Sequence, residues 1–536
     1  MSPKKNNNIQ ACQQILSELA RFGMNEIVYC AGSRNAPFVK LLGELENTRI
    51  YSFFEERSAA FFALGRCRAL QKPVAVITTS GTAAAELLPA CIEAFYSGVP
   101  LILITADRPK RLRFTGAPQC IDQTKIMSSF VEQSFDLENS NLILDDWTLS
   151  APLHINVCLD EPLIDSQIMP WRLPASQAVS AGKPHSPQFT DNIAQMNSAV
   201  VSAERPLIVL GGLDGSEEIK AATKICLNLQ WPIYAEASSG LRESVELKAL
   251  LLKGGEQLTS HLFKKLKFDL ILRLGSVPTT RLWRDLEEAR DQVKVLSISP
   301  LNFSGLSESL FVQSRLTDFV KYIDWHTSKA QQAWQKILAG RDAELSALTE
   351  SLYEKYPLAE PSFVRKLSEN VKTDELVYIG NSLPIREWDL TASVQKPIQV
   401  FANRGANGID GQLSTYLGLT AHSKNRSWCI IGDLTALYDL TAPWVLKSLS
   451  LKNHIFVIIN NGGGQIFRRI YNNPLFENNH DLDFSHWAKM WGLDYQCMKD
   501  KAFVEKISGP CVIEIVPDAD QTKNFWIEHS ELIKTL

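Results

Sequence analysis

The sequence predicts an α/β protein made of three consecutive domains, each built on an open parallel sheet. The 536 residues are too many for a single hydrophobic core, because domains average about 150 residues. Short apolar runs, rich in β-branched residues, alternate with helical patterns along the chain. These runs are apolar on both faces, which is typical of strands in a parallel sheet that helices cover on each side.

The first domain is predicted over residues 1–180. Its strands are the runs EIVYCAG, PVAVITTSG, VPLILITAD and HINVCLD, each of which ends in Gly or Asp. Helices are predicted from Ser58 and from Thr82, between these runs. Residues 167–203 are rich in Pro, Ser, Gln and Ala, a composition that predicts a linker.

The second and third domains are predicted over residues 181–345 and 346–536. The strands of the second are RPLIVLGG, FDLILRLGS and VKVLSIS. Those of the third are ELVYIGN, IQVFANRG, SWCIIGD, HIFVIINN and PCVIEIV. A charged stretch over residues 329–355 predicts a helix that joins the two domains.

Composition narrows the class of protein. Apolar residues make up 45%, charged residues 21%, and the formal net charge is −4, so nothing favours binding to nucleic acid or to an anionic membrane. The start of the chain lacks the apolar segment of a signal peptide, and no run of about 18 apolar residues occurs. The ten cysteines have no metal-ligand spacing, which predicts reduced, buried thiols. We therefore expect a cytoplasmic protein without a membrane span.

Gly432 and Asp433 end one predicted strand, and Asn461 follows another, 28 residues later (461 − 433). Carboxyl ends of parallel strands are where open α/β sheets bind ligands. A carboxylate, an amide oxygen and a carbonyl from the following Gly-rich turn form a set of hard oxygen ligands suited to Mg²⁺. The helix predicted from Leu434 offers N–H groups to a diphosphate. Each motif alone is also a common way to end a strand or make a turn.

Further motifs occupy the first and third predicted domains in a fixed order. They are AGSRNAP (31–37), TTSGTA (78–83), TADRP (105–109), GAPQ (116–119), GNSLPIR (380–386), NRGANGIDG (403–411), GDLTALYD (432–439) and GGQIF (463–467). With the GD…NN pair, they make the chain resemble the 2-succinyl-5-enolpyruvyl-6-hydroxy-3-cyclohexene-1-carboxylate (SEPHCHC) synthase family of menaquinone biosynthesis. These enzymes depend on thiamine diphosphate and have three α/β domains of the thiamine-diphosphate enzyme type.

The resemblance implies a cofactor site divided between two domains. Asp433, the Asn461 side chain and the Gly463 carbonyl would hold Mg²⁺ or Mn²⁺, next to the cofactor-binding residues Gly432 and Leu434. Glu56, in the run FFEER, would protonate the aminopyrimidine ring, and it is preferred to Glu55 because it directly precedes Arg57 as in the family. A glutamate in the first turn of a helix is otherwise usually a surface residue.

Apolar contacts to the cofactor are implied at three positions. Ile409 would hold the cofactor in its bent form, although an ordinary core isoleucine is an equal alternative. Ile466 and Phe467 would line the wall around the thiazolium ring.

Arginines follow four predicted strands, at Arg34, Arg108, Arg386 and Arg404. Surface exposure is the default for arginine, but guanidinium groups also suit carboxylates, and the substrates implied by the resemblance are dicarboxylates. The family pattern places Arg34, Arg108 and Gln119 near isochorismate. It places Ser382 and Arg386 near the end derived from 2-oxoglutarate, and it leaves Arg404 unassigned between the two. Arg281 would be the contribution of the middle domain, although Thr280 stands where some relatives have Lys.

The resemblance implies decarboxylation of 2-oxoglutarate and conjugate addition of the resulting carbanion equivalent to isochorismate. It also implies at least a homodimer, with a dimer of dimers as the alternative. Two other functions stay open. The first is another thiamine-diphosphate 2-oxoacid decarboxylase or an acetolactate-synthase-like carboligase, which would not require the arginine motifs. The second is a catalytically silent, ligand-binding relative, against which Glu56, Asp433 and Asn461 argue.

Overall fold

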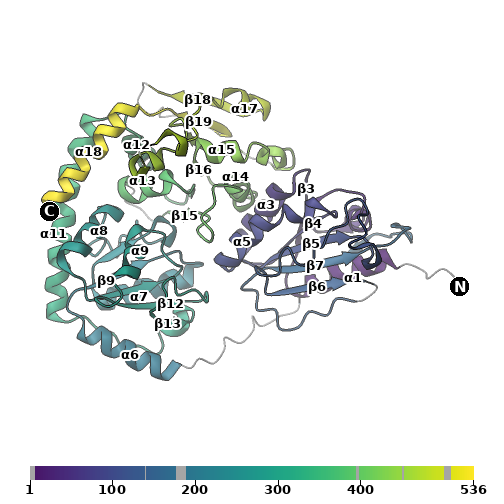
Figure 1. Ribbon diagram of the computed structural model, residues 1–536, viewed down its shortest axis with the longest axis horizontal. Helices are drawn as coiled ribbons and strands as arrows, with labels where there is room; N and C mark the ends of the chain where they lie inside the picture. Colours follow the sequence, from purple (N-terminus) through teal and green to yellow (C-terminus); the bar gives the residue numbers. More distant parts are fainter. Residues whose placement is uncertain are drawn as a thin grey trace. The chain divides into compact units, whose positions relative to one another are not determined.

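The computed structural model describes residues 7–138, 141–176, 189–393, 398–449, 452–471, 473–499 and 509–536. Three large sheets, all parallel, confirm the predicted α/β class (Figure 1). The chain divides into two compact units. Unit 1 comprises Met1–Lys183, Gly405–Ser423 and Thr435–Leu451, and unit 2 comprises Pro184–Arg404, Lys424–Leu434 and Lys452–Leu536. The boundaries of the three predicted domains stay a prediction.

The sheet of unit 1 has six strands. Their order is β3 (Arg49–Phe53), β1 (Glu26–Cys30), β4 (Val74–Thr78), β5 (Leu101–Asp107), β7 (Leu153–Cys158) and β6 (Gln133–Leu137). Helices α1 (Asn8–Arg21) and α2 (Ala36–Gly43) bury their apolar residues against one face, whereas α3 (Glu56–Leu70) contacts β1 and β4 and α5 (Leu88–Ser97) contacts β5. Burial on both faces explains why β4 and β5 consist entirely of buried residues.

Helix α14 (Gln412–Thr420) packs closely on α3 within unit 1. A Cβ atom on Gly65 would lie 2.1 Å from the carbonyl oxygen of Thr415, and one on Gly418 would lie 2.1 Å from that of Phe62. Both glycines are therefore required by the close approach of the two backbones. A segment that falls in the predicted third domain thus packs on a helix of unit 1.

Unit 2 contains two sheets with cores of their own. The first has the order β10 (Ile233–Ala235), β9 (Pro206–Leu210), β11 (Leu270–Leu274), β12 (Lys294–Ser299) and β13 (Leu310–Gln313). The second has the order β15 (Gln399–Phe401), β14 (Leu376–Ile379), β16 (Ser427–Gly432), β17 (His454–Ile459), β19 (Cys511–Ile515) and β18 (Asp494–Met498). The charged helix predicted between them is α11 (Lys329–Lys355).

The predicted linker is wrong over part of its length. Helix α6 spans Phe189–Ser202, because Met196, Ala199 and Val200 recur at helical spacing and bury themselves in the core of the five-stranded sheet. Residues 177–188 of that predicted linker lie outside the described residues.

Two further expectations from composition can be compared with the structure. All ten cysteines are free thiols, and eight of them are buried, as predicted. Within the described ranges, no helix is long and apolar enough to cross a membrane.

Candidate active site

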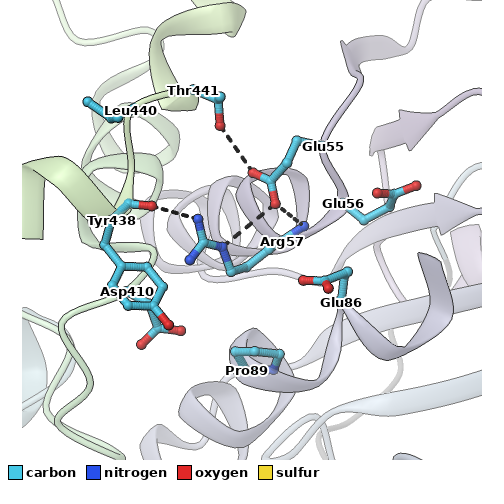
Figure 2. Close-up of a pocket in the computed structure, with 9 residues that line it drawn as sticks. All are labelled: Glu55, Glu56, Arg57, Glu86, Pro89, Asp410, Tyr438, Leu440 and Thr441. Atoms are coloured by element: carbon cyan, nitrogen blue, oxygen red, sulfur yellow. Dashed lines mark hydrogen bonds and ion pairs between the residues drawn. The ribbon is translucent and has the colours of Figure 1, made fainter. Parts of the chain in front are cut away.

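Two adjacent glutamates stand at the start of α3 and have different surroundings. Glu55 is the N-cap, and its carboxylate accepts hydrogen bonds of 3.0 Å from the backbone N–H groups of both Arg57 and Ser58. It also accepts from the hydroxyls of Ser58 and Thr441. Glu56 is the first helical residue, and in Figure 2 it makes no hydrogen bond to the residues drawn, whereas Glu55 is joined to Arg57 and Thr441. Capping therefore occupies Glu55 and leaves the Glu56 carboxylate available.

Glu56 lines a pocket of about 580 Å³ in unit 1. The other lining residues are Glu55, Arg57, Glu86, Pro89, Asp410, Tyr438, Leu440 and Thr441 (Figure 2). Burial raises the pKa of Glu56, and the negative charges of Glu55 and Glu86 raise it further, while its own backbone N–H lowers it. A carboxyl group that holds its proton more firmly than usual is suited to proton transfer near neutral pH.

The residues predicted to bind the metal ion come together in unit 2, because β16 and β17 are neighbouring parallel strands with Gly432 opposite Ile459. Asp433 is buried and accepts hydrogen bonds from the N–H groups of Leu434 (2.6 Å) and Gly463 (2.9 Å). The Oδ1 atom of Asn461 is buried without a hydrogen-bond partner in the described part of the chain.

This donor set fits a bound cation. A buried, unpaired amide oxygen is rare unless a ligand satisfies it, and it stands here beside a buried carboxylate. The Gly463 carbonyl accepts one hydrogen bond, from the N–H of Gln465 (2.9 Å), which leaves its second lone pair free for a ligand. Gly463 has φ +136°, and a Cβ there would lie 2.5 Å from the carbonyl oxygen of Glu477, so the turn requires glycine.

Arg34, Arg108 and Gln119 gather on loops at the carboxyl ends of strands in unit 1. Arg34 is buried and donates to the Leu159 carbonyl at 3.0 Å. Arg108 donates from Nε to the Pro118 carbonyl at 2.7 Å, directly before Gln119. Burial lowers the pKa of Arg34 and the positive charge of Arg108 lowers it further, whereas the carboxylates of Glu161, Asp160 and Asp107 raise it. Glu161 Oε1 lies 3.4 Å from Arg34 Nη1. Two cations held close enough to repel each other are suited to an anionic ligand.

Arg386 and Arg281 are linked through one carboxylate in unit 2. Arg386, on α13 (Leu383–Thr391), pairs with Glu256, which also accepts from the backbone N–H of Arg281. The Arg281 side chain is largely exposed and lies 3.7 Å from Asp285. Ser382 precedes α13 and has φ +76°, a strained conformation for a residue with a Cβ and one that is often found at functional sites.

Arg404 lies at the end of β15 and is held by two residues that the sequence patterns did not single out. Its Nη1 donates to Asn381 Oδ1 at 2.8 Å, and its Nη2 lies 3.9 Å from the buried carboxylate of Glu236. Its Nε is buried and has no hydrogen-bond partner among the described residues. Arg404 therefore keeps its Nε donor available for a ligand.

The three predicted apolar contacts are only partly covered by protein. Ile409 is half-buried and belongs to none of the five core clusters described for the placed residues, and its partial exposure disfavours the alternative of an ordinary core isoleucine. Ile466 is half-buried as well, and 40% of Phe467 is exposed. Phe467, Tyr471 and Phe476 form an aromatic cluster with ring centroids 4.4 to 6.4 Å apart. Arg468, beside it, is exposed.

The predicted site residues are divided between the two compact units. Glu56, Arg34, Arg108, Gln119 and Ile409 belong to unit 1, and the others belong to unit 2. The carboxylates Glu86, Glu236, Glu256 and Glu360, which contact or flank predicted site residues, were missed. No local pattern in the sequence distinguishes them from other glutamates, because their partners are distant in the chain.

Comparison with known proteins first defines the class. The family model described as "Thiamine pyrophosphate enzyme, N-terminal TPP binding domain" matches residues 9–126, which include Glu56, Arg34 and Arg108. Together with the parallel sheets and the carboxylate pocket, this match defines a thiamine-diphosphate-dependent enzyme.

Relatives that match almost the whole chain then define the family. The chain is 40% identical to the 2-succinyl-5-enolpyruvyl-6-hydroxy-3-cyclohexene-1-carboxylate synthase of Bdellovibrio bacteriovorus, over 98% of this chain and 99% of the relative. It is 35% identical to the Akkermansia muciniphila synthase of the same name, over 95% and 96%, and 34% identical to that of Geobacillus kaustophilus, over 89% and 88%. The chain belongs to the SEPHCHC synthase family.

Proposed function

We propose that this chain decarboxylates 2-oxoglutarate and joins the resulting succinyl carbanion equivalent to isochorismate, which gives SEPHCHC and CO₂ in menaquinone biosynthesis. Similarity to synthases of that name along the full length supports the proposal. The structural observation that supports it is the position of Arg34 and Arg108 on loops that follow β1 and β5 of the same sheet, where the positive charge of Arg108 acts on Arg34. A simple 2-oxoacid decarboxylase has no need of such a second anion site.

Thiamine diphosphate supplies the carbon nucleophile and the electron sink for loss of CO₂ when it is bound. Glu56 would hold and return the proton of its aminopyrimidine ring, since this carboxylate is free of capping contacts and its pKa is raised. Asp433, Asn461 Oδ1 and the Gly463 carbonyl would hold Mg²⁺ or Mn²⁺ against the diphosphate. Ile409, Ile466 and Phe467 would provide apolar surface around the rings.

Arginines would orient the two acids. Arg34, Arg108 and Gln119 would bind isochorismate, and Ser382 and Arg386 would bind the part derived from 2-oxoglutarate, with Arg281 nearby through the shared carboxylate of Glu256. Bidentate guanidinium contacts fix the direction of a carboxylate as well as its position. Arg404, which contacts Asn381 and Glu236, would add a further cation to the pocket formed by Ser382 and Arg386.

The proposal includes a homodimer, or a dimer of dimers, in the cytoplasm. Apolar side chains of Phe467, Ile470, Tyr471, Leu475 and Phe476 are 40% to 87% exposed in the single chain, and a surface of this kind is typical of a protein interface. Size-exclusion chromatography with light scattering would test the assembly. Free cysteine thiols agree with a reducing compartment.

Mass spectrometry of the product tests the function most directly. The purified protein, supplied with 2-oxoglutarate, isochorismate, thiamine diphosphate and Mg²⁺, is expected to release CO₂ and form SEPHCHC. Formation of succinic semialdehyde alone, whether or not isochorismate is present, would identify a simple decarboxylase. If the protein binds the cofactor but converts neither 2-oxoglutarate nor isochorismate, it would be a catalytically inactive, ligand-binding relative.

A further inference from the structure

Glu360 is the hydrogen-bond acceptor of the predicted metal ligand Asn461. It is the first residue of α12 (Glu360–Asn370), and only 2% of it is exposed. Both of its carboxylate oxygens accept hydrogen bonds from the side-chain Nδ2 of Asn461, at 3.1 and 2.9 Å. Its own backbone N–H donates to the Thr522 hydroxyl at 3.0 Å, so the carboxylate stands on an anchored helix start.

This contact determines which way the Asn461 amide faces. Both oxygens of Glu360 act as acceptors of the Asn461 NH₂ group, which places the NH₂ end of the amide toward Glu360 and the oxygen end away from it. The Oδ1 atom therefore points away from Glu360, and it is the atom that is buried without a partner among the described residues. A side-chain amide can in general be flipped so that its oxygen and its NH₂ group exchange places. The contact with Glu360 disfavours the flipped orientation of Asn461, in which the NH₂ group would face the cation.

We propose that Glu360 is a positioning residue, which presents the Asn461 oxygen to the metal ion and makes asparagine, rather than aspartate, the residue required at position 461. This inference rests on the metal site of the proposed function. Both oxygens of Glu360 lie within hydrogen-bond distance of Asn461 Nδ2, so the proposal assigns Glu360 to the support of a ligand and not to the ligand set. Residues that orient metal ligands in this way typically change metal affinity by about 10- to 100-fold.

The first test compares Glu360→Ala with Glu360→Gln. The affinity for Mn²⁺ in the presence of thiamine diphosphate is measured by electron paramagnetic resonance, without any turnover. The alanine variant is expected to bind Mn²⁺ about 10- to 100-fold more weakly. The glutamine variant is expected to recover much of this loss, because its amide oxygen still accepts from Asn461. Unchanged Mn²⁺ affinity in Glu360→Ala would overturn the proposal and leave Glu360 a structural residue.

Glu375→Ala is a matched control. Glu375 is also a buried carboxylate that accepts from a side-chain N–H, that of Trp428 at 2.8 Å. It precedes β14 and lies at the amino end of the same sheet, whereas the metal ligands lie at the carboxyl ends of the strands. Its loss is expected to lower the Tm without weakening Mn²⁺ binding. Equal loss of Mn²⁺ affinity in both alanine variants would overturn the specific role of Glu360.

A second test exchanges donor and acceptor and does not depend on the stability of the alanine variant. Asn461→Asp alone places two carboxylates against each other, and like charges in a buried site disfavour each other strongly. Its Mn²⁺ affinity is expected to fall by about 100-fold or more, and adding Glu360→Gln is expected to restore it at least about 10-fold, because the introduced amide can donate to the new carboxylate. Purely additive losses in the double variant would overturn the proposal. Wild-type protein that binds no Mn²⁺ with the cofactor would instead refute the metal site itself.

Discussion

Glu56 in unit 1 and Asp433 in unit 2 occupy equivalent local positions but differ in how firmly they are held. Each is the first residue of a helix, α3 and α15 (Asp433–Tyr438) respectively, and burial raises the pKa of both carboxyl groups. Asp433 accepts from two backbone N–H groups, those of Leu434 and Gly463. Glu56 makes no such contact to another residue of its pocket, because Glu55 caps the helix in its place (Figure 2).

The difference matches two kinds of chemistry. A metal ligand benefits from a fixed position, and hydrogen bonds from backbone N–H groups also favour the ionised form that a cation requires. A proton-transfer group must gain and lose its proton without breaking the local fold. Because Glu55 caps α3, Glu56 can gain or lose a proton without breaking the hydrogen bonds at the start of the helix.

Glu56→Gln is expected to have the largest effect on turnover. The amide keeps the shape of the side chain but cannot supply and recover a proton, and general acid–base catalysis contributes about 10²- to 10⁴-fold. We expect kcat to fall by that factor while calorimetry shows nearly unchanged binding of thiamine diphosphate. Near wild-type kcat would show that the freedom of this carboxylate is not used in catalysis and would turn attention to Glu55.

Asp433→Ala is expected to lower activity by weakening cofactor binding, whereas Glu56→Gln lowers kcat. Loss of the only carboxylate in the predicted ligand set should weaken binding of thiamine diphosphate with Mg²⁺ by about 100-fold or more, beyond what a supporting residue contributes. Activity should return in part with excess cofactor and Mg²⁺, unlike that of Glu56→Gln. Calorimetry that shows unchanged cofactor affinity would remove Asp433 from the metal site.

Arg34→Ala and Arg386→Ala should separate the contributions of the two units to substrate binding. Removing a charged hydrogen bond to a carboxylate costs about 1.5 to 3 kcal/mol, or roughly 10- to 100-fold. Arg386→Ala is expected to slow CO₂ release from 2-oxoglutarate in a single turnover without isochorismate. Arg34→Ala is expected to spare that step and to raise KM for isochorismate. Equal damage to CO₂ release in both variants would contradict the assignment of two pockets.

Glu55→Ala is expected to have the smallest effect on catalysis and a measurable effect on stability. Loss of an N-cap costs about 0.5 to 2 kcal/mol, so the Tm should fall while kcat remains within a few-fold of the wild-type value. Urea unfolding followed by circular dichroism would measure the stability. A loss of kcat as large as that of Glu56→Gln would show that the two glutamates do not divide capping and proton transfer as the geometry indicates.

Eleven of the twelve predicted strands lie inside the three sheets, and the twelfth, β15, is an edge strand. The five unpredicted strands of these sheets are β3, β6, β10, β13 and β18, and every one of them is an edge strand. Edge strands such as β3 and β18 contain exposed and half-buried residues, so they lack the continuous buried apolar run by which a central parallel strand is identified. Helix α6 was missed because its Ser, Gln and Asn residues resemble a linker until its apolar stripe is matched to a core.

The sequence by itself determined the α/β class, the central strands and, through short motifs, the candidate residues that carry the chemistry. Such motifs are local, since a strand end and its following turn are encoded by consecutive residues. Only the tertiary structure decided which carboxylates support these residues: Glu55 as a cap rather than an acid, Glu236 beside Arg404, and Glu360 behind Asn461. The last two pairs are separated by more than 100 residues in the chain, 404 − 236 and 461 − 360. The 3.9 Å ion pair of Arg404 with Glu236 and the hydrogen bonds of 2.9 and 3.1 Å from Asn461 to Glu360 arise only when separate strands and helices pack together.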